Sequence, residues 1–109
     1  MRRWVEDPDQ TLHAPHLVDV EVANALRRLA AKDVISHRTA ARALALAAGL
    51  DLQRYPHTDL LPRIWELSHN ATAYDAAYLV LAEVLEVPLV TADSALAEVP
   101  GSRAEVLLI

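Results

Sequence analysis

The chain has 109 residues and a formal net charge of −5 at pH 7, and its length suits one domain with a modest core. Hydrophobic residues make up 53% of it and only two residues are glycine, which excludes a disordered chain and favours a helix-rich globular one. The absence of cysteine excludes a disulfide scaffold and a thiolate metal site, and the negative charge excludes a broad basic footprint for nucleic acid.

No apolar run approaches the length that a membrane span needs, and the first residues, M-R-R-W-V-E-D-P-D, lack the pattern of a signal peptide. A cytoplasmic protein is therefore expected. The chain has no internal repeat, low-complexity tract or linker, so we interpret residues 1–109 as a single domain.

The N-terminal third is expected to form a strand and a long helix. Residues 1–10 read as the end of a helix and a turn. Leu12–Val18 read as an irregular strand, because Pro15 cannot donate to a strand ladder. Asp19 is placed as the N-cap of a helix that runs to about Lys32.

Polar residues occupy one face of this long helix. Glu21 lies in its first turn, and Asn24 lies one turn later on the same face, where it could serve the same site. Glu21 could instead only compensate the helix dipole. Two neighbouring arginines are expected on a solvated face, Arg27 and Arg28.

The middle of the chain is expected to hold two more helices with a strand between them. In chain order we expect a helix from Ser36 to Ala48 that Gly49 stops, a strand over Asp51–Tyr55, and a helix that Thr58 or Asp59 caps and that ends near Asn70. Trp65, on the last of these helices, is expected in the core or against a partner.

The stretch from Thr72 to Asp93 organises the rest of the chain. Apolar residues recur there at helical spacing with Glu83 as the exception, and Pro88 is expected to end the helix. Thr72 and Asp75 are spaced as in a capping box, so Asp75 could serve only as a helix cap.

Two short strands complete the chain. Leu89–Thr91 is too apolar for an exposed sheet edge, and Glu105–Ile109 is expected to be buried on both faces. Asp93 follows the first of these strands and could cap a short helix over residues 94–97. The alternation of strands and helices predicts an α/β fold with a parallel sheet between helices.

Such a fold binds ligands beyond the carboxyl ends of its strands, and two of three candidate carboxylates occupy such places. Glu21 follows the first strand and Asp93 follows the third. Asp75 opens the helix that leads to the third strand, and the sequence alone does not fix its side of the sheet. If they converge, their mutual repulsion requires a cation, and oxygen ligands select Mg²⁺ or Mn²⁺. Such a cation could activate water against a phosphodiester. Three unrelated helix caps remain the alternative.

Three blocks of the sequence carry a family resemblance: H-A-P-H-L-V-D-V-E-V-A-N-A-L-R-R-L, T-A-Y-D-A-A-Y-L-V-L-A-E and V-P-L-V-T-A-D-S-A-L-A. Together they resemble the PIN-domain ribonucleases, and most closely the VapC-type toxins of toxin–antitoxin pairs. The resemblance implies a three-layer α/β/α sandwich, RNA cleavage with Mg²⁺ or Mn²⁺, a homodimer and an inhibitory VapB-type antitoxin. It implies metal-binding roles for Glu21, Asp75 and Asp93, with supporting roles for Asn24, Thr72 and Thr91.

The beginning of the chain departs from that pattern. Members of this family start with an apolar strand that ends in Asp, whereas this chain starts at what reads as the end of the following helix. The first central strand and its Asp are therefore expected to have no counterpart here. A ribonuclease toxin is the leading hypothesis. The alternatives are a non-catalytic PIN remnant that binds an antitoxin or a second copy of itself, and a generic α/β domain.

Overall fold

The computed structural model describes residues 11–109, so the helix end and turn expected over residues 1–10 lie outside the described part. The elements in order are β1 (Leu12–Pro15), α2 (Leu17–Ala31), α3 (His37–Ala48), β2 (Leu52–Tyr55), η1 (Thr58–Leu60), α4 (Leu61–Glu66), α5 (Ala73–Leu85), β3 (Leu89–Thr91), η2 (Ser94–Glu98) and β4 (Val106–Leu108). None of the helices in this range has the length and apolar composition needed to cross a bilayer.

The strands form two parallel pairs. β1 pairs with β2, with Leu12 opposite Leu52, and β3 pairs with β4, with Leu89 opposite Val106. Helical segments connect the strands of each pair, as parallel pairing requires. The predicted α/β class with parallel strands is confirmed, and within residues 11–109 the sheet is divided in two.

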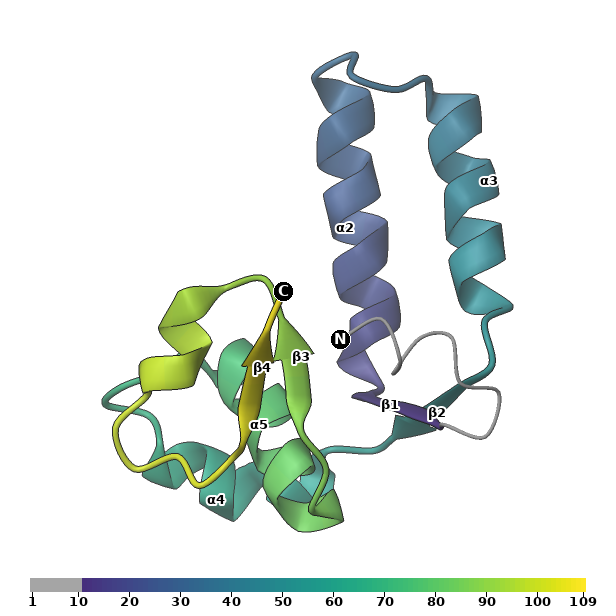
Figure 1. Ribbon diagram of the computed structural model, residues 1–109. Coiled ribbons are helices and arrows are strands. Elements are labelled where there is room, and N and C mark those ends of the chain that lie inside the picture. The colour runs from purple at the N-terminus through teal and green to yellow at the C-terminus, as the bar shows by residue number, and fades with distance from the viewer. Residues whose placement is uncertain (1–10) are drawn as a thin grey trace.

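The two strand pairs lie in different parts of the molecule (Figure 1). β1 and β2 lie at the foot of a hairpin formed by α2 and α3, whereas β3 and β4 lie with α4 and α5. Helix α5 contacts both β1 and β3 and so joins the two parts. The radius of gyration is 15.0 Å, against about 13 Å expected for a compact chain of this length. The hairpin that stands away from the rest accounts for this extension.

The core is centred on α5. Its buried members are Ile64, Leu67, Ala76, Ala77, Leu79 and Val80. Among the described residues, α2 contributes no buried side chain and α3 contributes Ala40 alone. Most of the hydrophobic stabilisation therefore comes from the C-terminal half of the chain.

Two predicted caps, at Thr72 and Asp93, are confirmed, and Ser36, predicted as the start of its helix, is the N-cap of α3. The backbone N–H groups of Thr39, Asp75 and Ala95 donate to the side chains of Ser36, Thr72 and Asp93, respectively. Helix α5 ends at Leu85 rather than at the proline, with Glu86 in the left-handed conformation at φ 55°. Pro88 disfavours the helical conformation at the residue before it, so the helix closes earlier.

The predicted start of the long helix was wrong. Strand β1 ends at Pro15, and α2 begins at Leu17 with His16 before it. Asp19 is not the N-cap; it lies in the first turn, where its carboxylate accepts hydrogen bonds of 2.9 and 3.0 Å from Arg54 Nε. This ion pair joins residues 35 apart in the chain, which a local pattern does not reveal.

The helix predicted from residue 58 or 59 to Asn70 is shorter and begins differently. A 3₁₀ turn, η1, leads into α4, which ends at Glu66, and neither Thr58 nor Asp59 provides a side-chain cap. Pro62 occupies the first turn of α4, where its missing N–H leaves no backbone acceptor unsatisfied. Trp65 is 77% exposed, so it is not a core residue of the described chain. Its contact with a partner stays a prediction.

The last two strands are more exposed than predicted. Val90 of β3 is 38% exposed, and Leu108 of β4 is 49% exposed. The prediction that β4 is buried on both faces was therefore wrong. The prediction that β3 does not form an exposed sheet edge was also wrong. Each strand lies in a two-stranded sheet, so each has one unpaired edge within the described residues.

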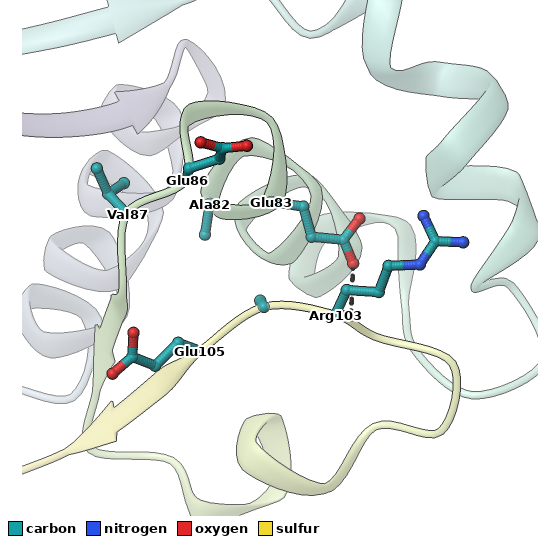
Figure 2. A pocket seen from close by; sticks show the side chains of 7 residues that line it. Ala82, Glu83, Glu86, Val87, Arg103 and Glu105 are labelled. Carbon is teal, nitrogen blue, oxygen red and sulfur yellow. Dashed lines mark hydrogen bonds between the residues drawn. The ribbon is translucent and has the colours of Figure 1, made fainter.

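A network of ion pairs closes the C-terminal half. Arg63 Nε and Nη2 donate to Glu83 at 2.9 and 3.0 Å, and the backbone N–H of Arg103 donates to Glu83 Oε2 at 2.8 Å (Figure 2). Arg63 Nη2 also donates to the carbonyl of Gly101 at 2.7 Å. The φ of +85° at Gly101 requires glycine in this turn. Hydrogen bonds from Arg63 and then from Arg103 lower the pKa of Glu83 below its usual value of 4.5.

Replacing Glu83 by glutamine is expected to lower the free energy of unfolding by about 1–3 kcal/mol at neutral pH, since hydrogen bonds to a charged group are lost. A lowered folded-state pKa gives stability that is fully present above the unfolded value of 4.5 and lost as the pH falls through the folded value. Urea unfolding should therefore show the two proteins converging below pH 4.5. Glu66→Gln, at the exposed partner of Arg63, is the control, with an expected change within about 0.5 kcal/mol.

Candidate functional site

A short hydrogen bond joins α2 to α5 at the first of the predicted acids. Tyr78 Oη donates to Glu21 Oε1 at 2.5 Å, between residues 57 apart in the chain. Burial first, and then the bond to Glu21, raises the pKa of Tyr78, so the hydroxyl keeps its proton and acts as a donor. Tyr78 therefore fixes the position of the Glu21 carboxylate.

Asp75 lies on α5 one turn before Tyr78 and is half-buried. Its backbone N–H donates to Thr72 Oγ1 at 3.1 Å, so the cap is made by Thr72. Within residues 11–109 the Asp75 carboxylate accepts no hydrogen bond from another residue, and its charge helps to raise the pKa of Tyr78. Capping thus explains Thr72 and leaves the Asp75 carboxylate without a hydrogen bond inside residues 11–109, one turn from the tyrosine that bonds Glu21.

Asp93 is exposed and lies in the other part of the fold, directly after β3. Its Oδ1 accepts from the N–H of Ala95 at 3.0 Å, and its own N–H donates to Thr91 Oγ1 at 3.0 Å. The carboxylate is therefore used as the cap of η2. Thr91 supports the backbone of Asp93 rather than its carboxylate.

The three acids are not gathered into one cluster. Within residues 11–109, no three His, Asp or Glu side chains lie close enough together to hold a metal ion. Their oxygen atoms are the donors that Mg²⁺ and Mn²⁺ prefer, but the arrangement does not bring Asp93 to Glu21 and Asp75. The donor chemistry fits a divalent cation, and the geometry of the described residues does not.

An open cavity of about 550 Å³ borders Glu21. It is lined by Val20, Glu21, Asn24 and Arg28 of α2 and by Tyr74 of α5. Glu21 and Asn24 share one face of the helix, as predicted, and Asn24 Oδ1 accepts from Arg27 Nε at 3.1 Å.

Two tyrosines at this site were not identified from the sequence, namely Tyr74 and Tyr78. Both lie on α5 close to Asp75, at spacings of one and three residues. That proximity was the available signal, but the pattern alone could not show that they face α2.

A second cavity, of about 250 Å³, is lined by three glutamates and an arginine (Figure 2). Glu83 is already satisfied by the arginine network, and Glu86 and Glu105 come from the end of α5 and from the residue before β4. Two of its lining residues, Glu83 and Arg103, therefore belong to the hydrogen-bond network of the C-terminal half.

Residues 1–102 match the PIN-domain family. The chain belongs to the PIN-domain family. This PIN domain is 48% identical over 98 residues to Ribonuclease VapC1 of Mycobacterium tuberculosis (strain CDC 1551 / Oshkosh), a match that covers 89% of the chain and 74% of that relative. The resemblance read from the three sequence blocks is confirmed.

Two other relatives are similar over nearly the same length. The PIN domain is 43% identical over 100 residues to VapC ribonuclease Mb0985 of Mycobacterium bovis (strain ATCC BAA-935 / AF2122/97), covering 92% of the chain and 79% of the relative. It is 36% identical over 100 residues to Ribonuclease VapC12 of M. tuberculosis, a match that covers 92% of the chain and 78% of that relative.

Proposed function

We propose that this PIN domain is an endoribonuclease, the toxin of a VapBC-type toxin–antitoxin pair. The observation that carries the proposal is its 48% identity to Ribonuclease VapC1 over 89% of the chain. The substrate is RNA, the inhibitory partner is a VapB-type antitoxin, and the working form is a cytoplasmic homodimer.

The proposed cofactor is Mg²⁺ or Mn²⁺, held by Glu21, Asp75 and Asp93. When bound, such a cation offsets the charge of the acids and lowers the pKa of a water molecule for attack on phosphorus. The chain's own contribution is positional, because Tyr78 orients Glu21 and Thr72 fixes the backbone of Asp75. Support comes from the oxygen donors and from the meeting of α2 and α5. Asp93 must approach the other two acids for the set to act together.

A second candidate is favoured by one observation, the lack of a three-acid group within residues 11–109. In this alternative the chain is a non-catalytic PIN domain that binds an antitoxin or a second copy of itself. The two candidates differ in whether the protein turns over RNA, so one assay separates them.

Cleavage of single-stranded RNA by the purified chain is the test. The endoribonuclease is expected to cut RNA with Mg²⁺ or Mn²⁺ and to stop when the chelator EDTA is added. Undiminished cleavage in EDTA would overturn the metal-dependent mechanism. No cleavage under either condition, combined with formation of a stable dimer or antitoxin complex, would support the non-catalytic candidate.

Replacing Tyr78 by phenylalanine is expected to reduce the turnover number for RNA about 10- to 100-fold. The change removes the hydroxyl that holds Glu21 and leaves the ring in place, and loss of such an orienting partner typically has an effect of this size. Steady-state kinetics should show the loss in kcat rather than in KM.

Tyr55→Phe is the matched control for this prediction. The Tyr55 hydroxyl also forms a side-chain hydrogen bond, with His13 Nδ1 at 2.7 Å, and within residues 11–109 it bonds none of the three acids. Tyr55→Phe should leave kcat within a factor of about two. It should change the free energy of unfolding by about as much as Tyr78→Phe does, since each substitution removes one side-chain hydrogen bond. Equal kinetic effects of the two substitutions would show that Tyr78 has only a structural role.

A further inference from the structure

We propose that the cavity beside Glu21 is a nucleotide-binding subsite, in which the ring of Tyr74 stacks on an RNA base and Arg28 contacts a neighbouring phosphate. This inference rests on the proposed ribonuclease function and names two residues that would hold the strand next to the acids. The cavity has a volume of about 550 Å³, which lies within the roughly 300–1,000 Å³ typical of small-molecule sites.

The α2 wall of the cavity follows from helical spacing. Glu21, Asn24 and Arg28 stand at positions i, i+3 and i+7, so they lie along one face of the helix. Seven residues at 1.5 Å each separate the two ends by about 10 Å along the axis. The acid, Glu21, stands at the end next to the proposed cation. The guanidinium of Arg28 stands at the other end, where a flanking phosphate of the RNA would lie.

Arg28 is suited to a phosphate. It is exposed, and among residues 11–109 no carboxylate forms a salt bridge with it, whereas Arg54 and Arg63 are each paired with an acid. A guanidinium binds phosphate oxygens in a bidentate manner. On a chain of net charge −5, an arginine in a cavity beside the candidate site is a local cation of the kind that RNA contact requires.

Tyr74 is suited to a base. Its side chain is 64% exposed although it belongs to α5, the most buried helix of the molecule, and it forms part of the cavity wall opposite α2. Val20, 72% exposed, adds an apolar contact on the other wall. Aromatic side chains beside a basic group are the usual platform for unpaired bases, because every base has a face that can stack.

Binding of a fluorescent single-stranded RNA, measured in EDTA so that no cleavage occurs, tests the subsite. Tyr74→Leu is expected to raise the Kd about 5- to 150-fold, the range for loss of one stacked base. Arg28→Gln is expected to reduce the slope of log K against log salt concentration by about 0.7, the value for one phosphate contact on a single strand.

Matched controls lie on other faces. Trp65→Leu removes an aromatic side chain that is 77% exposed on α4, and Arg42→Gln removes an exposed arginine on α3. Both should leave the Kd and the salt slope unchanged. Circular dichroism checks that all four variants are folded.

The subsite and the proposed function fail in different ways. Unchanged RNA affinity in both Tyr74→Leu and Arg28→Gln, as expected if a peptide occupies the cavity, would overturn the subsite, as would the absence of RNA binding by the parent chain. Cleavage that still depends on Glu21 would then keep the proposed function. Weakened binding in the two variants without any cleavage by the parent chain would keep the subsite and overturn the ribonuclease.

Discussion

Replacing Asp75 by asparagine is expected to reduce RNA cleavage at least about 100-fold. Loss of a group that only orients a metal ligand typically reduces activity 10- to 100-fold, and loss of a proposed ligand should have a larger effect. The Asp75 carboxylate lies one turn before Tyr78, the partner of Glu21, and accepts no hydrogen bond from the rest of residues 11–109, so its proposed role is with the cation rather than in the cap. Initial rates with Mn²⁺ provide the measurement.

Two further variants and a stability measurement make this result interpretable. Glu21→Gln should give a loss of the same order, and Asp59→Asn, an exposed acid of η1 outside the site, should give none. Asp75→Asn should lower the free energy of unfolding by only about 0.3–1 kcal/mol, through the lost interaction with the helix dipole. Activity unchanged in both Asp75→Asn and Glu21→Gln would remove the proposed mechanism.

Replacing Leu79 by alanine is expected to lower the free energy of unfolding by about 2–5 kcal/mol. Leu79 is 0% exposed at the centre of the cluster that α5 forms with Ile64 and Leu67, so truncation loses buried area and leaves a cavity. The free energy of unfolding of a whole domain is only about 5–15 kcal/mol, and here the α2–α3 hairpin adds little buried surface. Urea unfolding followed by circular dichroism should show a large drop in the midpoint.

Val84→Ala is the control on the same helix. Val84 is 61% exposed, although its position in the apolar pattern predicted burial, and its loss should change the free energy of unfolding by about 0.5 kcal/mol or less. Equal losses at the two positions would mean that α5 is not the centre of the core.

Local chemistry was predictable and long-range pairing was not. The predicted caps at Thr72 and Asp93 depend on residues within a few positions, and both are present. Periodicity likewise located α5 because one helix buries a continuous set of apolar side chains. The start of α2 was missed because Asp19 is held by Arg54, on a strand far along the chain.

In the candidate site, too, local features were predictable from the sequence and long-range contacts were not. The residue types of Glu21 and Asp75 indicated cation chemistry, but Tyr78, which donates to Glu21, could be recognised only once α2 and α5 were seen to meet. Glu83 was the informative exception: an acid within an apolar stripe signals a partner, and the structure supplies Arg63. No local pattern could have revealed that partner, 20 residues away.

Because α5 contacts both β1 and β3, the helix acts as the common support of two separately paired sets of strands. Glu21 follows one set and Asp93 follows the other, so a small rotation of either set about the helix changes the separation of these side chains. In the proposed enzyme, ion affinity and the relative orientation of the two sets are thermodynamically coupled. Any ligand that favours the orientation in which Asp93 lies nearer Glu21 would tighten ion binding, and the ion would tighten the binding of that ligand by the same factor.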